Sequence, residues 1–179
     1  PFLHLPVQSG SNRILKSMNR GHIVEEYLEI INKLRYVRKD ICFSSDFIVG
    51  YPGETDKDFQ ETIDLCEKVQ FSQAYSFNYS SRPGTPASRK KDLDENLKKT
   101  RLHVLQDLLN KQQTTFLKEQ KNRKHKVLFE KTGRGIDEYV GRTEQFSPVT
   151  VVSKENIVGE IMSVKINSVM SHSLKGVLK

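Results

Sequence analysis

The chain contains no tryptophan and only two cysteines among its 179 residues. Two cysteines, Cys42 and Cys66, cannot build the disulfide framework of a small secreted domain. Both lie in apolar surroundings, so we expect them to be buried, and a reducing compartment follows as the default. No closely spaced group of Cys, or of Cys and His, occurs, so the sequence predicts no metal or iron–sulfur site within this chain.

Long apolar runs are also missing. No run approaches the ~20 residues that cross a bilayer, and the first residues lack the basic and apolar regions of a signal peptide. A composition of 36% hydrophobic and 28% charged residues excludes collagen-like and low-complexity chains. We therefore predict a cytoplasmic protein with no membrane partner, built as one large domain or two small ones.

Charge is distributed unevenly along the chain. Residues 1–80 hold 9 Lys and Arg against 11 Asp and Glu, whereas residues 81–179 hold 20 against 11. Within 98–126 there are 9 basic and only 2 acidic residues. A local basic segment is typical of a protein that binds a polyanion, although a solvated helix face gives the same pattern.

Residues 1–80 show strands alternating with amphipathic helices. We expect strands at about 2–8, 40–49 and 74–79, with helices at about 11–18, 23–34 and 55–69. Thr55 followed by Asp58 resembles a capping box at the start of the last helix. Because the chain begins with proline and directly enters an apolar strand, we also expect it to be the back part of a longer protein.

Such an alternation predicts a parallel sheet, whose chemistry lies at the carboxyl ends of the strands. Those ends are followed by 8–11, 50–54 and 80–85, which are rich in Gly, Pro and hydroxyl side chains. Each loop alone could be an ordinary turn. Three of them at one sheet edge favour a small-molecule site, since glycines allow a ligand to approach the backbone.

The second half begins with a polar loop and a long helix at about 95–122. Leucines occupy one face of this helix, and Lys98, Lys99 and Arg101 are expected on its other faces. From Val127 onwards the apolar period changes to two, and turn residues separate about five short strands. This pattern predicts a small barrel of the oligonucleotide-binding kind, which either binds RNA or serves as a structural cap.

Three motifs in this order resemble the radical SAM methylthiotransferases. They are Leu3–Ser11, Ser44–Thr55 and Tyr79–Pro86, and the strands around Gly141–Glu144 look like the TRAM domain that ends this family. The resemblance implies an α/β half of a radical SAM barrel of parallel strands, then a long helix and a small five-stranded antiparallel β-barrel. The expected divisions are 1–95 for the half barrel, 96–125 for the basic linker helix and 126–179 for TRAM.

The resemblance also implies a chemistry. Family members cleave S-adenosyl-L-methionine reductively and insert a methylthio group at carbon 2 of an isopentenylated adenosine beside the tRNA anticodon. They use two 4Fe-4S clusters, whose ligands are absent from this chain, and an electron donor such as flavodoxin. The expected partners are therefore the tRNA anticodon stem-loop, an N-terminal half or partner chain that carries the clusters, and that donor.

Site residues follow from the resemblance by position. Ile48, Val49 and Gly50 would lie against the adenine of the cofactor, and Gln8 and Ser9 would bind its ribose or amino-acid part. A further candidate, Arg82, would face the cofactor carboxylate or a substrate phosphate.

On the RNA side, Lys126, Arg134 and Arg142 would contact phosphates and Tyr139 would stack on a base. No catalytic residue is expected in this chain.

Four alternatives remain open from the sequence. A sibling branch modifies an aspartate of a ribosomal protein, and another acts on threonylcarbamoyl-adenosine in tRNA. The chain could also be a stand-alone TRAM-type RNA binder without catalysis. Finally, it could be a remnant whose exposed sheet edges promote aggregation.

Overall fold

The computed structural model describes all 179 residues. The chain forms two compact units, one of residues 3–112 and one of residues 113–179 together with Pro1 and Phe2. The unit boundary falls within the longest helix, α4 (Glu95–Glu119). No helix is both long and apolar enough to pass through a bilayer.

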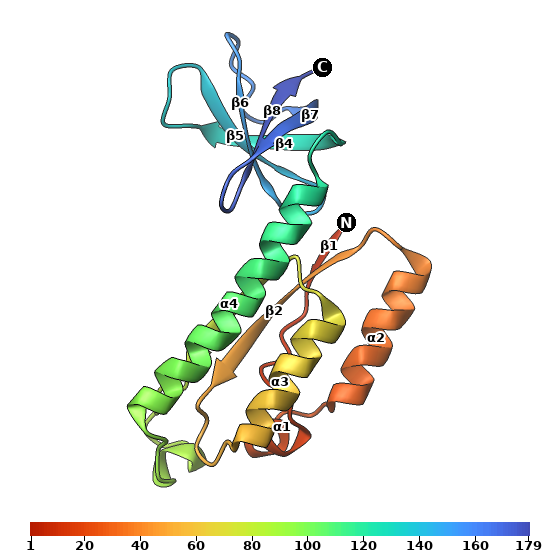
Figure 1. Ribbon diagram of the computed structural model, residues 1–179. Helices are drawn as coiled ribbons and strands as arrows, with labels where there is room; N and C mark the ends of the chain where they lie inside the picture. The colour runs from red at the N-terminus through yellow and green to blue at the C-terminus, as the bar shows by residue number, and fades with distance from the viewer. The chain divides into compact units, whose positions relative to one another are not determined.

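The first unit is a three-stranded sheet with helices packed on one face (Figure 1). The strand order is β1-β2-β3, and β2 and β3 are parallel. Its elements are β1 (Phe2–His4), α1 (Asn12–Ser17), α2 (Val24–Val37), β2 (Cys42–Val49), α3 (Asp56–Val69), β3 (Gln73–Asn78) and the 3-10 helix η1 (Pro86–Arg89). The predicted parallel sheet and alternating helices are confirmed.

The first strand is shorter than the expected span of 2–8. Pro6 has no N–H to donate to a neighbouring strand, and Gln8 has a left-handed backbone with φ of 76°. Regular pairing therefore stops after His4, yet Gln8 returns to the sheet through a parallel bridge to Phe47. The peptide of Gln8 is held on both sides, by Asp46 and by Ile48.

Helix α3 begins where its short-range signal places it. Thr55 accepts the Asp58 N–H at the start of α3, and the Asp58 carboxylate accepts the Thr55 N–H at 2.8 Å. This reciprocal arrangement confirms the predicted capping box. It also fixes the direction in which the chain leaves the loop after β2.

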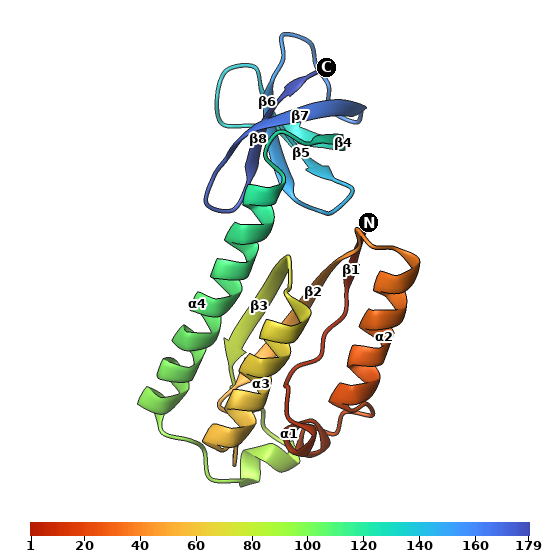
Figure 2. The same cartoon turned by 45° about the vertical axis from the view of Figure 1, so that its right-hand side comes forward.

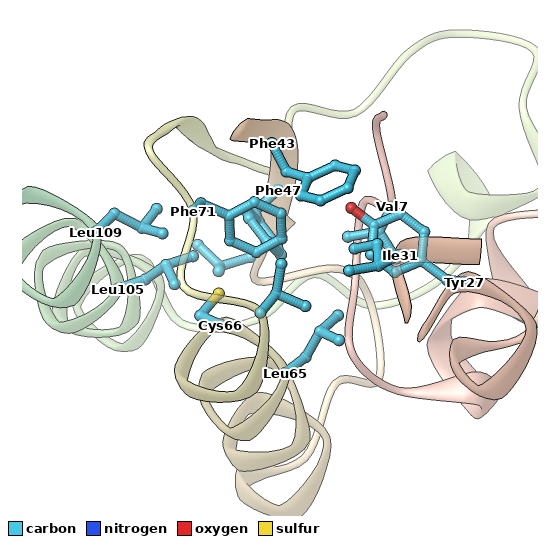
Figure 3. Packing of buried hydrophobic residues seen from close by; sticks show 12 residues of the cluster. Val7, Tyr27, Ile31, Phe43, Phe47, Leu65, Cys66, Phe71, Leu105 and Leu109 are labelled. Atoms are coloured by element: carbon cyan, nitrogen blue, oxygen red, sulfur yellow. The ribbon is translucent and has the colours of Figure 1, made fainter. Parts of the chain in front are cut away.

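The core of the first unit lies between the sheet and three helices (Figure 3). β2 contributes Phe43, Phe47 and Val49, which all project from one face because alternate strand residues share a side. The helices contribute the other side of this core. These residues are Tyr27 and Ile31 from α2, Leu65, Cys66 and Val69 from α3, and Leu105 and Leu109 from α4. The first half of α4 is therefore an integral part of this core.

The second unit is a closed barrel that follows the end of α4. Its strands are β4 (Lys124–Thr132), β5 (Glu138–Thr143), β6 (Pro148–Val152), β7 (Ile161–Val169) and β8 (Leu174–Leu178), in the order β4-β5-β6-β8-β7 (Figure 2). The five expected strands are present. The barrel is mixed rather than fully antiparallel, because β6 and β8 pair in parallel through Val149 and Thr150.

The barrel interior is filled by one apolar cluster. It comprises Leu117, Val127, Phe129, Val149, Val151, Ile157, Val164, Ile166 and Leu174. Gly141 allows β4 and β5 to approach closely, since a Cβ there would lie 2.3 Å from the Leu128 carbonyl oxygen. The barrel is therefore a packed core, and its outward side chains are the part available to a ligand.

Candidate functional site at the sheet edge

A pocket of about 510 Å³ lies at the carboxyl end of the sheet. It is lined by Gln8, Asp46, Ile48, Phe77, Asn78, Tyr79, Ser80 and Arg82. These residues come from all three strand ends, which is the place where parallel sheets bind ligands. Of the three glycine- and hydroxyl-rich loops noted in the sequence, 8–11 and 80–85 contribute to this pocket, whereas 50–54 does not.

Three of the predicted cofactor residues are brought together here. Gln8, Ile48 and Arg82 line the same pocket, although they are separated by tens of residues in the chain. The left-handed backbone of Gln8 turns the chain at this point, a conformation that costs energy for a residue with a side chain. The guanidinium of Arg82 is exposed and forms no ion pair or hydrogen bond, so it is available to an anion.

The other three predicted residues lie behind the pocket. Ser9 is fully buried and its hydroxyl accepts the Ser11 N–H at 3.1 Å. Val49 points into the core on the opposite face of the sheet. The N–H of Gly50 donates to the Glu54 carboxylate at 2.8 Å, so its amide is already occupied.

A buried ion pair fixes the loop that follows β2. Glu54 and Arg101 are 1% and 4% exposed, and Nη1 of Arg101 donates to the Glu54 carboxylate at 2.8 Å. The same nitrogen donates to the Glu54 carbonyl oxygen at 3.1 Å. Burial raises the pKa of Glu54, while the Gly50 amide and Arg101 partly offset this effect. Arg101 therefore joins α4 to the loop after β2.

Lys98 and Arg101 differ from the expectation for the basic helix. Both are buried, whereas the sequence pattern placed them on solvated faces. The Lys98 ammonium lies 3.0 Å from Asp92 and 2.5 Å from Glu95, and its stem packs against Gly50. Part of the positive charge of α4 is thus neutralised internally.

A second polar cluster anchors the loop after β1. The buried Asp58 accepts hydrogen bonds from Ser11 at 2.6 Å, from the Arg13 guanidinium and from Thr55. Burial acts to raise the pKa of Asp58, but these donors outweigh it and hold the pKa well below its usual range. The cluster fixes α1 against the start of α3.

Sequence reasoning did not select Asn78 or Tyr79. The Oδ1 atom of Asn78 and the hydroxyl of Tyr79 are buried without a hydrogen-bond partner, and both residues line the pocket. Buried polar atoms are normally satisfied, so such a pair at a pocket marks a place for a polar ligand. Only their position at the end of β3 could have indicated them beforehand.

The two cysteines are free and buried, as predicted. Burial raises the pKa of Cys42 to about 11, and it raises the pKa of Cys66 further. Thiols in such surroundings resist conversion to the thiolate that ligates metals. No group of three or more His, Cys, Asp and Glu side chains could hold a metal ion.

The predicted RNA residues lie in different situations on the barrel. Lys126 and Arg134 are exposed. Arg142 has its guanidinium 4.3 Å from the centre of the Phe146 ring and 3.3 Å from Glu130. Tyr139 is half-buried against the barrel core, which limits its ring as a stacking surface.

Strand pairing places Lys126 on a basic outer face of the barrel. Its partner across β4 and β7 is Ser163, the neighbouring pair is Lys124 with Lys165, and the next pair is Leu128 with Ile161. Paired residues share a side, and these project away from the buried Val127 and Val164. We call this set the β4–β7 face: Lys124, Lys126, Leu128, Ile161, Ser163 and Lys165.

Comparison with known proteins assigns both halves of the chain. Residues 1–66 match the Radical SAM superfamily. Over 98% of its length the chain is 52% identical to a tRNA-2-methylthio-N(6)-dimethylallyladenosine synthase of Bartonella tribocorum, of which it spans 38%. It is 49% identical, again over 98% of its length, to the protein of the same name from Rickettsia felis, of which it spans 40%. The chain therefore spans about two fifths of these relatives.

The matched region, with identity near one half, covers 98% of the chain and therefore includes both units. The three motifs at the strand ends and the barrel sequence together indicated the same family. The chain is thus similar over nearly its whole length to tRNA-2-methylthio-N(6)-dimethylallyladenosine synthases, and its first 66 residues match the Radical SAM superfamily.

Proposed function

We propose that the chain supplies the cofactor wall and the RNA-holding unit of an enzyme that methylthiolates N6-dimethylallyladenosine in tRNA. The observation that carries this proposal is the pocket at the strand ends, where Gln8, Ile48 and Arg82 meet in a chain with about half its residues identical to those synthases. The ribosomal-protein and threonylcarbamoyl-adenosine branches are disfavoured because the relatives' names specify dimethylallyladenosine.

The side chains that line the pocket suit the groups of S-adenosylmethionine. Ile48 offers an apolar surface for the adenine, and Arg82 offers a cation for the carboxylate. The Asn78 carbonyl oxygen and the Tyr79 hydroxyl lack partners that the polar atoms of such a ligand would provide. When bound, this cofactor supplies the radical that starts the reaction, and the residues here bind and orient it.

Iron–sulfur ligands do not come from this chain. Its two cysteines are buried, so the 4Fe-4S clusters that this chemistry requires would be held by an N-terminal half or a partner chain. We further propose that a flavodoxin-like donor reduces that part and that the protein acts on cytoplasmic tRNA. We also propose that residues 1–95, 96–125 and 126–179 are the corresponding functional parts.

For RNA, we propose that the β4–β7 face contacts the anticodon stem-loop, together with Arg134 and Arg142. Three lysines flank two exposed apolar side chains on this face, an arrangement that suits phosphates beside unstacked bases. Tyr139 stays a secondary candidate because of its half-buried ring.

A chimera tests the enzymatic proposal. The chain would replace the matching segment of the Bartonella tribocorum synthase, and tRNA nucleosides would be measured by mass spectrometry. We expect 2-methylthio-N6-dimethylallyladenosine from the chimera and its loss when Ile48→Glu places a carboxylate in the cofactor pocket. An iron-loaded, folded chimera that never forms the product would contradict the proposal.

A second candidate function, RNA binding without catalysis, is supported by the lysines of the β4–β7 face. Both the enzymatic proposal and this second function require the β4–β7 face to bind RNA. The dependence of tRNA affinity on salt concentration tests that requirement. Replacing Lys124 and Lys126 by Gln should reduce the slope of log affinity against log salt by about 0.7–0.9 per lost contact. Lys154→Gln, in a loop of the barrel, should leave the slope unchanged. Binding without methylthiolation in the chimera would favour this second function.

A further inference from the structure

A pocket of about 490 Å³ lies on the barrel, and none of its lining residues belongs to the β4–β7 face. Two of its walls are β6 and β8, which contribute residues 150–152 and 175–178. These strands are joined by only two residue pairs, the second of which is Thr150 with Lys175. Beyond it, the facing edges of β6 and β8 have no partner strand. The barrel therefore has a slot along this seam, where a ligand can reach both backbone edges.

A β-bulge in β7 forms a third wall of the slot. Ile166 pairs with Gly176 and Ser168 pairs with Lys175, so Asn167 is the extra residue between them. A bulge bends its strand and re-aims a side chain, and bulges are frequent next to active sites. Asn167 and Ser168 both line the pocket, and the Ser168 hydroxyl donates to the Asn167 carbonyl oxygen at 3.5 Å. The amide nitrogen of Asn167 has no partner within the chain, so it can donate to a ligand.

The charges at the slot favour an anionic ligand. Lys175 is exposed and forms no ion pair. Glu138 is the only acidic residue that lines the pocket, and its carboxylate accepts the N–H groups of Arg134 and Gly135, each at 3.1 Å. These amides offset the charge of Glu138. Residues 113–179 as a whole contain 12 Lys and Arg against 7 Asp and Glu, so the surroundings also attract anions.

Two valines give the slot an apolar surface. Val152 and Val177, one from each edge, are 68% and 48% exposed. The slot thus combines an apolar surface with an amide donor, hydroxyl groups and an ammonium group. This combination matches a nucleotide, because its base is flat with polar edges and its phosphate is anionic.

A peptide strand could also pair with open strand edges. However, β6 ends at Val152, only two residues beyond its last pair with β8. That length is shorter than the roughly three to ten residues of a typical strand, so this edge supports little of a hydrogen-bonded ladder. The side chains of the slot therefore favour a nucleotide over a peptide.

We propose that this pocket, which we call the β6–β8 slot, binds one unpaired nucleotide of RNA, with the base against Val152 and Val177 and the phosphate at Lys175. The inference rests on the proposed function and adds a second RNA contact to the barrel, separate from the β4–β7 face. A volume of about 490 Å³ lies within the range of small-molecule sites. Bases within a duplex are stacked on both faces, so only an unpaired base can enter the slot.

Valine methyl signals provide a direct test. Carbon-13 labelled valines of the whole chain would be followed by NMR during titration with single-stranded oligouridylate and with a blunt RNA duplex of the same length. We expect the methyl signals of Val152 and Val177 to shift with the single strand and to stay unchanged with the duplex. Val158, an exposed valine in the loop between β6 and β7, serves as the internal control.

Variants separate the base contact from the phosphate contact, with affinity measured from the Val152 methyl signal. Val177→Asp should weaken oligouridylate binding at least about tenfold, because a carboxylate beside a phosphate is strongly unfavourable. The matched change Val158→Asp lies outside the slot and should have little effect. Lys175→Gln should lower the slope of log affinity against log salt by about 0.7, the value for one contact to a single strand. Lys131→Gln, at an exposed position of β4 outside the slot, should leave the slope unchanged.

The outcomes are distinguishable. If the Lys124 and Lys126 variants change the salt dependence of tRNA binding but oligouridylate does not shift Val152 and Val177, the slot is wrong and the proposed RNA face stands. Equal shifts with the duplex, or a stronger response to oligoglutamate, would also overturn the slot, which would then take any polyanion or an acidic peptide. If neither tRNA nor oligouridylate binds at low salt, the slot and the proposed RNA-holding role fail together.

Discussion

At the scale of single residues, two buried carboxylates act through opposite electrostatic balances. At Asp58 the hydrogen-bond donors outweigh the effect of burial and lower the pKa of the carboxyl group. At Glu54 the effect of burial is larger and raises the pKa. The first arrangement stabilises the ionised state outright. In the second, the Gly50 amide and Arg101 together stabilise the buried carboxylate.

We predict that Asp58→Asn lowers the free energy of unfolding by about 1.5–3 kcal/mol, the value typical of hydrogen bonds to a charged group. Because the folded pKa lies below the unfolded one, the contribution of Asp58 is present above roughly pH 4 and is lost as the pH falls further. Denaturant unfolding from pH 7 to pH 2 would show a shallower acid decline in the variant. Asp64→Asn, an exposed change on α3, should leave the profile as it is; equal profiles for Asp58→Asn and wild type would refute the assignment.

Loss of Arg101 should be more costly. Arg101→Met leaves the Glu54 carboxylate buried without its cation, and removing one partner of a buried pair costs about 3–5 kcal/mol. The double variant with Glu54→Gln should lose less than the sum of the two single changes. Arg38→Met, which breaks an exposed pair with Asp40, should cost at most about 1 kcal/mol. Additive losses in thermal or chemical unfolding would argue against a coupled pair.

The burial of Arg101 could not be predicted from the sequence. It lies among many basic residues on a helix whose leucines alone mark a packed face. Its partners Glu54 and Asp56 are more than forty positions away, so only the folded arrangement brings them together. By contrast, the Thr55–Asp58 cap was predictable because both residues lie within one turn.

At the scale of elements, the loop after β2 depends on the backbone of two glycines. Gly50 has φ of 73° and Gly53 has φ of 85°. Their surroundings differ, because a Cβ on Gly50 would lie 2.4 Å from the Lys98 stem, whereas nothing lies within 4 Å of one on Gly53. Gly50 is therefore required both for its left-handed backbone and because a side chain would collide with Lys98. Gly53 is required for its left-handed backbone alone.

We predict that Gly53→Ala costs about 1 kcal/mol from backbone strain and that Gly50→Ala costs more. Lys98→Ala should recover part of the loss from Gly50→Ala and none of the loss from Gly53→Ala. Unfolding midpoints of the two single and two double variants would measure this. Equal losses at both glycines would show that the Lys98 contact is of no consequence.

Element types and order followed well from local patterns, and the exceptions have local causes. β1 ends at His4, because Pro6 cannot donate a backbone hydrogen bond and Gln8 has a left-handed backbone conformation. The parallel pairing of β6 with β8 involves only two residue pairs between strands separated by β7. No short-range signal records such a pairing, because it depends on how the barrel closes.

At the scale of the whole molecule, α4 contributes to two separate cores. Leu105 and Leu109 belong to the core of residues 3–112, and Leu117 belongs to the barrel core. The boundary between the units falls between Gln112 and Gln113. The sequence predicted a continuous leucine face but gave no indication that this face serves two partners.

We predict that Leu105→Ala and Leu117→Ala each cost about 2–5 kcal/mol, as expected for fully buried leucines. The losses should appear in different places in hydrogen exchange mass spectrometry. Leu105→Ala should release amides of β2 and α3, and Leu117→Ala should release amides of β4 and β7. Release of both sets by either variant would mean that the units unfold as one.

Both thiols of the chain lie in the first unit, and the barrel has none. Since Cys66 is fully shielded and burial raises the pKa of its thiol, an alkylating reagent can reach it only when that unit opens. The fraction of the protein that gains the mass of the reagent in a short pulse therefore gives the fraction of molecules in which the first unit is open. The barrel does not react, because it has no thiol. The rate at which Cys66 is alkylated therefore reports how often the sheet unit opens, and no added label is needed.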